Sequence, residues 1–435
     1  MRRNFTIWEH PSTGAWGPSA PCRKGRNMKK LHKILALTLA LSLLLLSACG
    51  PKEEPANPYV SGDVIVLDKI TDPVLTITGY PASTVVAKAG EQEITLGDVL
   101  YWMAVSGDQL LQYYGYLFNG EIPWSQTDEE GATLEQMMKQ DCLRTAGLYA
   151  LLPEKLAQAG LEPSQEALDQ AESTLESMRD ELETDEEFNY NMWYYFLTPE
   201  LYRKLISAQS GLQMLKEHYY GEGGESYPDD GQMYAQMEQE GYYFVKHILL
   251  ATVDTTTREP LDEETAAQKK KEAEDLLTQL ESSAEPAALF DQLMNQFSED
   301  PGLASSPDGY LAQPGQMVEP FETASLALGD YEISGLVESE HGYHIILRIP
   351  LKDAIGTEEL AAYRESYVDT KMQERMDGWL EESPAEGNEL FEGMDLPLYY
   401  EGLTALREAI QTELTPAGDA ASGSGSGSGD SSAKG

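Results

Sequence analysis

Two apolar strands that each carry one histidine constrain the fold of this chain more than any other feature. Residues 243–250 place His247 among Tyr, Phe, Val, Ile and Leu, and residues 342–349 place His344 in a similar run. An imidazole in such a strand must find a hydrogen-bond partner or cost stability. A pair can satisfy each other, with one ring nitrogen donating and the other accepting. We therefore expect one compact domain built around both strands.

The segment between the strands supplies further chemistry. It holds two helical patterns, the run Phe-Ser-Glu-Asp-Pro that ends at Pro301, and Gly-Gln-Met-Val-Glu-Pro-Phe-Glu over residues 315–322. Pro320 can occupy the first turn of a helix. Met317 and Phe321 lie four residues apart around that start, as in a shared apolar surface or in ordinary core packing. Asp300 is either a turn residue before Pro301 or a functional carboxylate.

The composition bounds the partners. The chain has 435 residues, enough for two or three domains. Its 30 basic and 74 acidic residues give a net charge of −44. Such a surface repels nucleic acid phosphates, so we expect no nucleic acid partner. The three cysteines form no Cys-x-x-Cys metal or redox motif, and Cys142 is expected to be a buried, inert thiol.

The first 84 residues are predicted to contain a targeting signal and a tether. Residues 1–27 have no periodic pattern and are interpreted as an untranslated or disordered extension. Residues 28–48 combine a basic start with a short apolar run, which is typical of a signal peptide. The run ends in Leu-Ser-Ala-Cys-Gly and resembles the lipobox of bacterial lipoproteins, in which the cysteine, here Cys49, is acylated. Residues 49–84 are expected to be a tether.

The rest of the chain is predicted to be mainly helical. Residues 85–231 begin with a hairpin that turns at Gly90 and Glu91, followed by Thr95 as an N-cap with Asp98. Helices are expected near 132–159, 164–183 and 199–219. Residues 353–382 show one apolar stripe, which we expect to pack on 85–231 and so leave residues 232–352 as an inserted or appended domain. Residues 383–435 are predicted to be an acidic and then Gly/Ser-rich tail.

Five blocks in order make residues 242–349 resemble a parvulin-type peptidyl-prolyl cis/trans isomerase domain. They are Lys-His-Ile-Leu at 246–249, Phe-Ser-Glu-Asp-Pro at 297–301, Gly-Tyr-Leu at 309–311, residues 315–324 and Gly-Tyr-His-Ile-Ile-Leu at 342–347. The whole chain resembles the extracytoplasmic foldases of the PrsA type and, more distantly, the chaperone SurA. The fold class implied is α+β, with an antiparallel sheet flanked by helices inserted in or appended to a helical chaperone domain.

The resemblance also assigns roles. It implies that His247, Asp300 and His344 form the catalytic group and that Leu311, Met317 and Phe321 form the seat for the substrate proline. His341 would lie in a turn, where it is either near the mouth of the cleft or an ordinary solvated turn residue. Rotation about an amide breaks no bond, so neither a cofactor nor a metal is required. The partners implied are unfolded or newly secreted proline-containing polypeptides. Whether the protein forms a homodimer is left undecided by the sequence.

These expectations describe a foldase held by a lipid anchor at Cys49 on the extracytoplasmic face of the cell membrane. One departure from the family leaves an alternative. The loop over residues 309–315 is about two residues shorter than usual and lacks the aromatic residue that the family carries two positions after its Gly-Asp-Leu-Gly motif, which would suit a non-catalytic holdase with a degenerate parvulin domain. A solute-binding lipoprotein is disfavoured because the long helical run over residues 95–219 does not alternate strands with helices.

Overall fold

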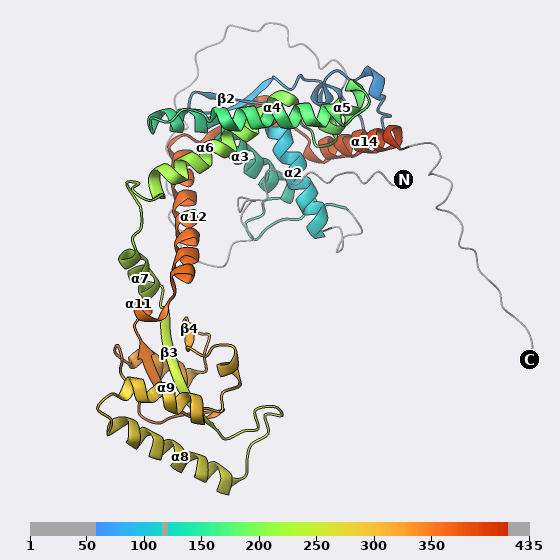
Figure 1. Ribbon diagram of the computed structural model, residues 1–435. Helices are drawn as coiled ribbons and strands as arrows, with labels where there is room; N and C mark the ends of the chain where they lie inside the picture. The colour runs from blue at the N-terminus through green and yellow to red at the C-terminus, as the bar shows by residue number, and fades with distance from the viewer. Residues whose placement is uncertain (1–57, 115–120, 416–435) are drawn as a thin grey trace, which may run out of the picture. The chain divides into compact units, whose positions relative to one another are not determined.

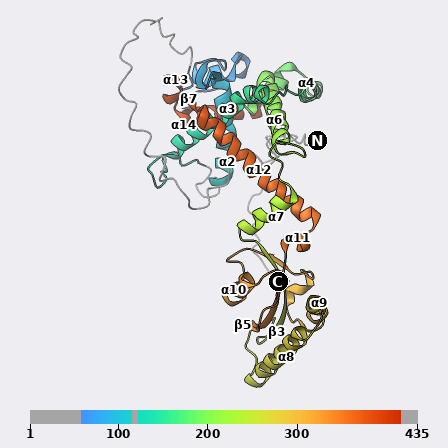
Figure 2. The same ribbon diagram turned by 90° about the vertical axis from the view of Figure 1, so that its left-hand side faces the viewer.

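The computed structural model describes residues 58–114 and 121–415, which divide into two compact units. The first unit combines residues up to His218 with residues from Glu374 onward, and the second spans Tyr219–Gln373. Figures 1 and 2 show the helices and strands of both units. The prediction of a parvulin-like α+β domain within a mainly helical chain is confirmed.

The first unit is built on a small sheet. The predicted hairpin is present as β1 (Val85–Ala89) and β2 (Gln92–Thr95), joined through Gly90, whose φ of +57° suits a glycine. Thr95 and Asp98 form the expected reciprocal cap at the start of α2 (Leu96–Tyr114), with the Asp98 backbone N–H 3.3 Å from the Thr95 hydroxyl. Further helices follow along the chain: α3 (Leu134–Gln158), α4 (Gln165–Asp180), α5 (Asp185–Tyr194) and α6 (Pro199–Tyr220).

The prediction that residues 383–435 are a tail is wrong for the part that the structure describes. Residues 385–387 form β7 (Ala385–Gly387), which pairs antiparallel with β1 and completes a sheet of order β2-β1-β7. After α13 (Glu389–Glu392), α14 (Leu396–Leu414) buries an apolar stripe that includes Leu403 and Ile410. An amphipathic stripe of this kind stabilises the chain only when it is packed, and here the first unit covers it.

The tether prediction is also wrong from residue 58 onward. Residues 58–84 contain η2 (Leu67–Lys69) and α1 (Pro73–Thr78). Asp72 caps α1 by accepting hydrogen bonds from the backbone of residues 74 and 75, and Ile77 is buried against α14. Residues 1–57, including Cys49, lie outside the described residues. Over the described ranges, no helix has both the length and the apolar character needed to span a bilayer.

The second unit contains a four-stranded antiparallel sheet of order β4-β3-β6-β5. Its strands are β3 (Tyr243–Ala251), β4 (Tyr310–Ala312), β5 (Val337–Ser339) and β6 (Gly342–Ile349). Helices α8 (Glu263–Glu281) and α9 (Pro286–Phe297) cover one face, and α10 (Glu319–Ala327) covers the other (Figure 2). Alternate residues of each strand therefore meet different partners.

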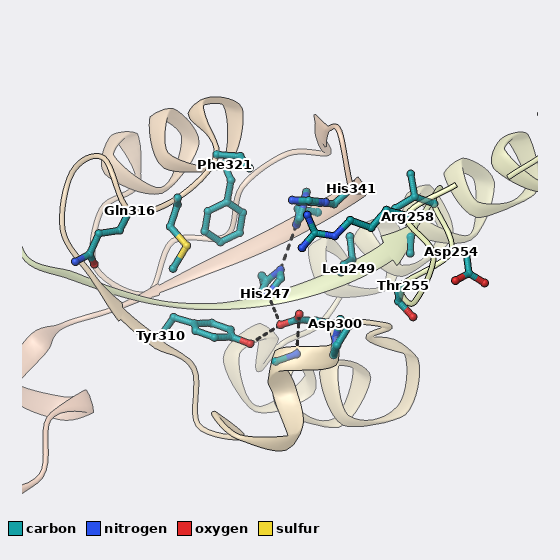
Figure 3. Close-up of a pocket in the computed structure, with 17 residues that line it drawn as sticks. His247, Leu249, Asp254, Thr255, Arg258, Asp300, Tyr310, Gln316, Phe321 and His341 are labelled. Carbon is teal, nitrogen blue, oxygen red and sulfur yellow. Dashed lines mark hydrogen bonds and ion pairs between the residues drawn. The ribbon is translucent and has the colours of Figure 1, made fainter. Parts of the chain in front are cut away.

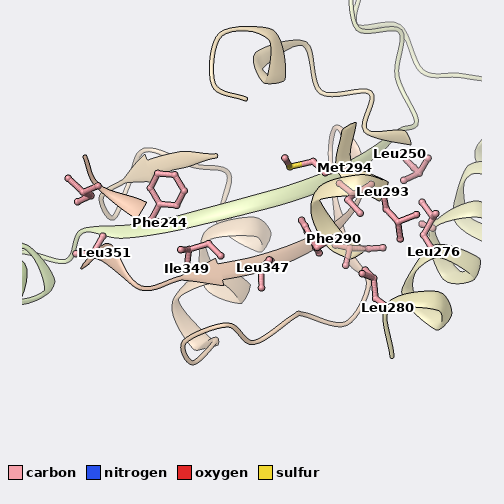
Figure 4. Close-up of a cluster of buried hydrophobic side chains, with 14 of the residues drawn as sticks. Phe244, Leu250, Leu276, Leu280, Phe290, Leu293, Met294, Leu347, Ile349 and Leu351 are labelled. Carbon is pink, nitrogen blue, oxygen red and sulfur yellow. The ribbon is translucent and has the colours of Figure 1, made fainter. Parts of the chain in front are cut away.

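The face under α8 and α9 carries the larger core. Phe244, Ile248 and Leu250 of β3 pack there against Phe290 of α9 and Leu276 of α8 (Figure 4). The alternate residues Tyr243, Val245 and His247 point to the opposite face of the sheet, which α10 covers. Because the first face is filled with apolar side chains, the two strands are held rigidly and the second face is free to form a site.

Two segment boundaries differ from the predictions. Helix α7 (Asp230–Gln239) begins before residue 232 and belongs wholly to the second unit. After α11 (Leu351–Ala354), α12 (Thr357–Glu382) starts in the second unit, where Leu360 is buried in the larger core, so the division between the two units falls within this helix and residues 353–373 belong to the second unit. Residues 374–382 belong to the first unit, where the Asp377 carboxylate pairs with the Arg144 guanidinium at 2.5 Å.

Cys142 of α3 is buried, as predicted for an inert thiol. Burial raises the pKa of its thiol to about 12, and the Ser106 hydroxyl lies 3.7 Å from the sulfur. A thiol of this kind carries almost no thiolate at neutral pH. Of the aromatic residues in 190–196, Tyr190 and Phe196 are buried and the other three are half-buried.

A pair of buried tyrosines gives a test of the packing. Tyr243 is fully buried, yet its hydroxyl has no hydrogen-bond partner within residues 58–114 and 121–415, whereas the Tyr399 hydroxyl donates to the Leu100 carbonyl at 2.9 Å. We expect Tyr243→Phe to leave the free energy of unfolding unchanged or to raise it by up to about 1 kcal/mol, because an unpaired buried hydroxyl is costly. The matched change Tyr399→Phe should lower it by about 1–2 kcal/mol. Chemical unfolding of the two variants measures both values, and equal losses would contradict the assignment.

Candidate active site

The two histidines meet on the face covered by α10. In the antiparallel register of β3 and β6, His344 lies opposite Leu249 and His247 opposite Ile346, so the two imidazoles are diagonal neighbours on one face. Their Nδ1 atoms are 3.2 Å apart and their rings are stacked, with centroids 5.4 Å apart. Both side chains are buried, so each imidazole needs partners within the protein.

The segment after α9 brings Asp300 to this pair. Its residues are bonded to β3: the Glu299 backbone N–H donates to the Leu249 carbonyl at 2.8 Å, and the Glu299 carboxylate accepts from the Ala251 N–H at 2.9 Å. Asp300 then caps the short helix η3 (Pro301–Ala304), with Oδ1 accepting from the Gly302 N–H at 3.0 Å. Its other oxygen, Oδ2, lies 2.9 Å from His247 Nε2. Asp300 is thus both a turn residue and a member of the site.

The hydrogen bonds fix the protonation of the imidazoles (Figure 3). A carboxylate can only accept, so His247 Nε2 carries a proton and, in the neutral ring, Nδ1 accepts from His344 Nδ1–H. His344 Nε2 is then an acceptor, and the Ser339 hydroxyl lies 2.7 Å from it. Ser339 in turn accepts from the His341 backbone N–H at 3.1 Å. The result is one continuous chain of donors from Ser339 to Asp300.

Burial and these bonds set the charges of the site. Burial, reinforced by the neighbouring His247, lowers the pKa of His344 to about 3. Burial alone would raise the pKa of Asp300, but hydrogen bonds from His247, Tyr310 and the Gly302 amide outweigh it and hold that pKa well below its usual value. At neutral pH the site therefore contains a neutral His344 beside a fixed carboxylate.

The low pKa of His344 makes the stability of the chain depend on pH. Between pH 6.5 and about 3 the unfolded chain binds a proton at this residue that the folded chain does not, so stability falls as the pH falls through that window. The effect amounts to at most about 5 kcal/mol at full protonation. Calorimetric unfolding from pH 7 to pH 4 should show this loss in the wild type and much less of it in His344→Asn. The variant His341→Gln, which removes only a smaller contribution to the lowered pKa of His344, should keep most of the wild-type dependence.

An apolar seat adjoins the imidazoles. Phe321 is buried, and its ring centroid lies 5.1 Å from that of His247 and 5.2 Å from that of His344. Met317 packs in the same cluster and lines the same cavity, which has a volume of about 430 Å³. Pro320 stands in the first turn of α10, as predicted, and so brings Met317 and Phe321 to one wall. The structure thus brings five of the six predicted catalytic and substrate-binding residues together.

Leu311 is the exception, and its assignment to the seat is wrong. Side chains of a strand alternate between faces. Tyr310 and Ala312 of β4 therefore point inward, while Leu311 points away from the cavity and is 41% exposed. Tyr310 takes the expected place: its ring centroid is 5.6 Å from that of His247, and it lines the cavity. We call Tyr310, Met317 and Phe321 the apolar seat.

The cavity has a polar end that sequence reasoning did not identify. Arg258 and Thr255, from the loop after β3, line it together with His341 (Figure 3). The loop is shaped by Asp254, whose carboxylate accepts from the backbone of residues 256 and 257. His341 was predicted either near the mouth of the cleft or in a solvated turn, and it does line the cavity. Ser339 was missed because a serine at the end of a three-residue strand carries no distinctive signal.

No metal site accompanies these residues. Within the described part of the chain, no group of three or more His, Cys, Asp and Glu side chains could hold a metal ion. The chemistry available is an apolar surface, a chain of hydrogen bonds and the half-buried carboxylate of Asp300.

Comparison with known proteins places this domain in a class. Residues 247–349 match the rotamase family described as the PPIC-type PPIase domain. The chain therefore contains a parvulin-type domain, and the residues matched include the whole of the site described above.

The wider relatives are foldases and chaperones. The chain is 34% identical over 139 residues to "Foldase protein PrsA" of Halalkalibacterium halodurans, covering 32% of this chain and 37% of that protein. It is 26% identical over 140 residues to "Chaperone SurA" of Burkholderia thailandensis, covering 32% and 29%. It thus spans about a third of the length of these relatives. A crystal structure of peptidylprolyl isomerase (PrsA) from Bacillus cereus aligns with 75% of this chain and 92% of that chain, at 17% identity and a TM-score of 0.24. Over about a third of its length, the chain is similar in sequence to the PrsA and SurA proteins, as its motifs predicted.

Proposed function

We propose that this protein is a peptidyl-prolyl cis/trans isomerase that acts as a foldase on newly secreted polypeptides. The observation that carries the proposal is the apolar seat, which shares one cavity with two hydrogen-bonded imidazoles and a half-buried carboxylate. The PPIC-type match over the same residues supports it.

The reaction requires only that the twisted amide be bound better than the planar one. Resonance flattens the prolyl amide and gives a barrier of about 18–20 kcal/mol. The seat holds the proline ring while the preceding residue rotates. Resonance also places negative charge on the carbonyl oxygen, and this charge diminishes as the amide twists. A fixed anion at Asp300 near that oxygen therefore disfavours the planar state more than the twisted state.

The histidines contribute shape and polarity to this site. His247 holds Asp300 in place through Nε2, and His344 fixes the tautomer of His247 through Nδ1. With His344 neutral, the chain of donors ends on Asp300, whose negative charge is not compensated by a cationic His344. The imidazoles act here as supports and not as acid and base.

The alternative function, a non-catalytic holdase, was suggested by the short loop over residues 309–315. In the structure that loop still supplies an aromatic wall, since Tyr310 replaces the aromatic residue that the loop lacks. The wall favours catalysis over a degenerate domain, and the holdase becomes an outcome of the test.

The test is the refolding of a protein limited by prolyl isomerisation, in the presence of catalytic amounts of the whole chain. An isomerase shortens the slow phase, which otherwise lasts tens to hundreds of seconds. We expect acceleration that is lost in Phe321→Ala. Suppression of aggregation without any change in the slow phase would instead identify a holdase.

The cellular setting belongs to the proposal as well. We place the protein on the extracytoplasmic face of the cell membrane, anchored by acyl chains on Cys49. The support is the sequence alone, namely the short apolar run that ends in Leu-Ser-Ala-Cys-Gly. Cys49→Ser should move the protein from the membrane fraction to the soluble one. Retention of the variant in the membrane would contradict the anchor.

A further inference from the structure

Tyr310 is bonded to the carboxylate at the centre of the site. Its hydroxyl donates to Asp300 Oδ2 over 2.5 Å, and the same oxygen accepts from His247 Nε2 at 2.9 Å. The second oxygen, Oδ1, accepts from the Gly302 N–H. Asp300 thus has three donors from three parts of the fold, namely β3, β4 and η3, and Oδ2 is shared between two of them.

Two glycines make this approach sterically feasible. A Cβ on Gly302 would lie 2.3 Å from the Tyr310 hydroxyl oxygen, so a larger residue there would displace the tyrosine. A Cβ on Gly309 would lie 2.6 Å from the Val245 carbonyl oxygen, and the φ of Gly309 is +116°, so only a glycine lets β4 come this close to β3. The local sequence is built to bring the phenol onto the carboxylate.

The shared oxygen couples Tyr310 to His247. A carboxylate oxygen that accepts two hydrogen bonds is fixed in direction by both donors, whereas one that accepts a single bond can rotate about the carboxyl axis. The phenol is held as a donor because burial and the neighbouring Asp300 raise the pKa of Tyr310 above its ordinary value. The ring of the same residue forms a wall of the seat.

We propose that Tyr310 is the positioning residue of this site: through the hydrogen bond from its hydroxyl, it fixes the orientation of the Asp300 carboxylate relative to the apolar seat, while its ring forms one wall of that seat. This inference rests on the proposed isomerase activity. It divides the contribution of one side chain into two parts, a hydroxyl that acts through Asp300 and a ring that contacts the substrate.

The two parts can be separated with single variants of the whole chain. Tyr310→Phe keeps the ring and removes the hydroxyl, so we expect kcat for a proline tetrapeptide to fall about 5- to 10-fold with KM unchanged. Tyr310→Leu removes both, so KM should rise as well. Tyr331→Phe is the matched control, because the Tyr331 hydroxyl also binds an aspartate, Asp353 at 2.9 Å, away from the cavity. It should leave kcat and KM as in the wild type.

A double-mutant cycle tests whether the hydroxyl acts through Asp300. If it does, Tyr310→Phe should have almost no effect in an Asp300→Ala background, with the double variant within about twofold of the single one. Additive losses would show that Tyr310 acts independently of Asp300 and would overturn the proposal. Thermal unfolding of each variant accompanies the kinetics, so that a general loss of structure is recognised.

A spectroscopic readout keeps the inference separate from the activity. In Tyr310→Phe, His247 becomes the only side-chain donor to Oδ2 among the described residues, and its bond should shorten. The proton resonance of His247 Nε2–H should then move downfield, while Tyr331→Phe leaves it in place. An unchanged resonance would contradict the positioning role. If the His247 Nε2–H resonance moves in Tyr310→Phe but the wild type does not isomerise the peptide, the proposed function is contradicted and the positioning role of Tyr310 is supported.

Discussion

Phe321→Ala should abolish most of the isomerase activity and also destabilise the second unit. Phe321 is 4% exposed, touches both imidazole rings and packs in the cluster formed with Tyr243, Val245 and Ile346. Removing a buried phenylalanine side chain costs about 3–5 kcal/mol. Because the substrate proline would lose its main contact, we expect kcat/KM for a proline tetrapeptide to fall about 100-fold.

The loss of activity must be separated from unfolding. Phe321→Leu keeps most of the apolar volume and should cost about 1 kcal/mol, so it remains folded at 25 °C. Its activity should fall about 10-fold, because the flat ring that faces the two imidazoles is lost. If Phe321→Leu were folded and fully active, the ring would not be part of the seat.

Asp300→Ala should have the second largest effect. The change leaves His247 Nε2–H and the Tyr310 hydroxyl without an acceptor in a partly buried site, at a cost of about 1–3 kcal/mol for each buried donor that stays unpaired. It also removes the anion that we propose to disfavour the planar amide. We expect kcat/KM to fall about 10- to 100-fold while the affinity for a proline peptide changes little.

A second aspartate in the same unit provides the control. Asp291 pairs with Lys246 at 2.7 Å and is about half exposed. Removing an exposed carboxylate of this kind costs less than about 1 kcal/mol. Asp291→Ala should therefore keep the wild-type activity, measured in the same peptide assay. A similar loss in both variants would show that the effect of Asp300 is one of general charge.

Local patterns were enough to predict most of the site. His247, His344, Asp300, Met317 and Phe321 each lie in a short motif whose geometry is set by neighbours along the chain. The alternation of β3 and β6 places both histidines on one face, and Pro320 fixes the start of α10. The predicted helices near 132–159, 164–183 and 199–219 agree with α3, α4 and α6 to within three residues.

The errors came from interactions between distant segments. In β4 a shift of one residue exchanges the inward and outward faces, so Leu311 was taken for Tyr310. Only the pairing with β3 settles the choice. The three-residue strand β7 is too short to recognise without its partner β1. Helix α14 did carry a signal, since Asp395 precedes Leu396 and Pro397 as an N-cap, and it was overlooked beside the low-complexity end of the chain.

The most direct test of the central claim is two-dimensional exchange NMR of a proline tetrapeptide mixed with catalytic amounts of the whole chain. Uncatalysed exchange between the cis and trans forms is too slow to give cross-peaks. The wild type should produce cis–trans cross-peaks, and Phe321→Leu should produce much weaker ones. The contrary result would be peptide resonances that broaden with the wild type but show no exchange cross-peaks. The cavity would then bind proline without isomerising the prolyl amide, and the account would be wrong.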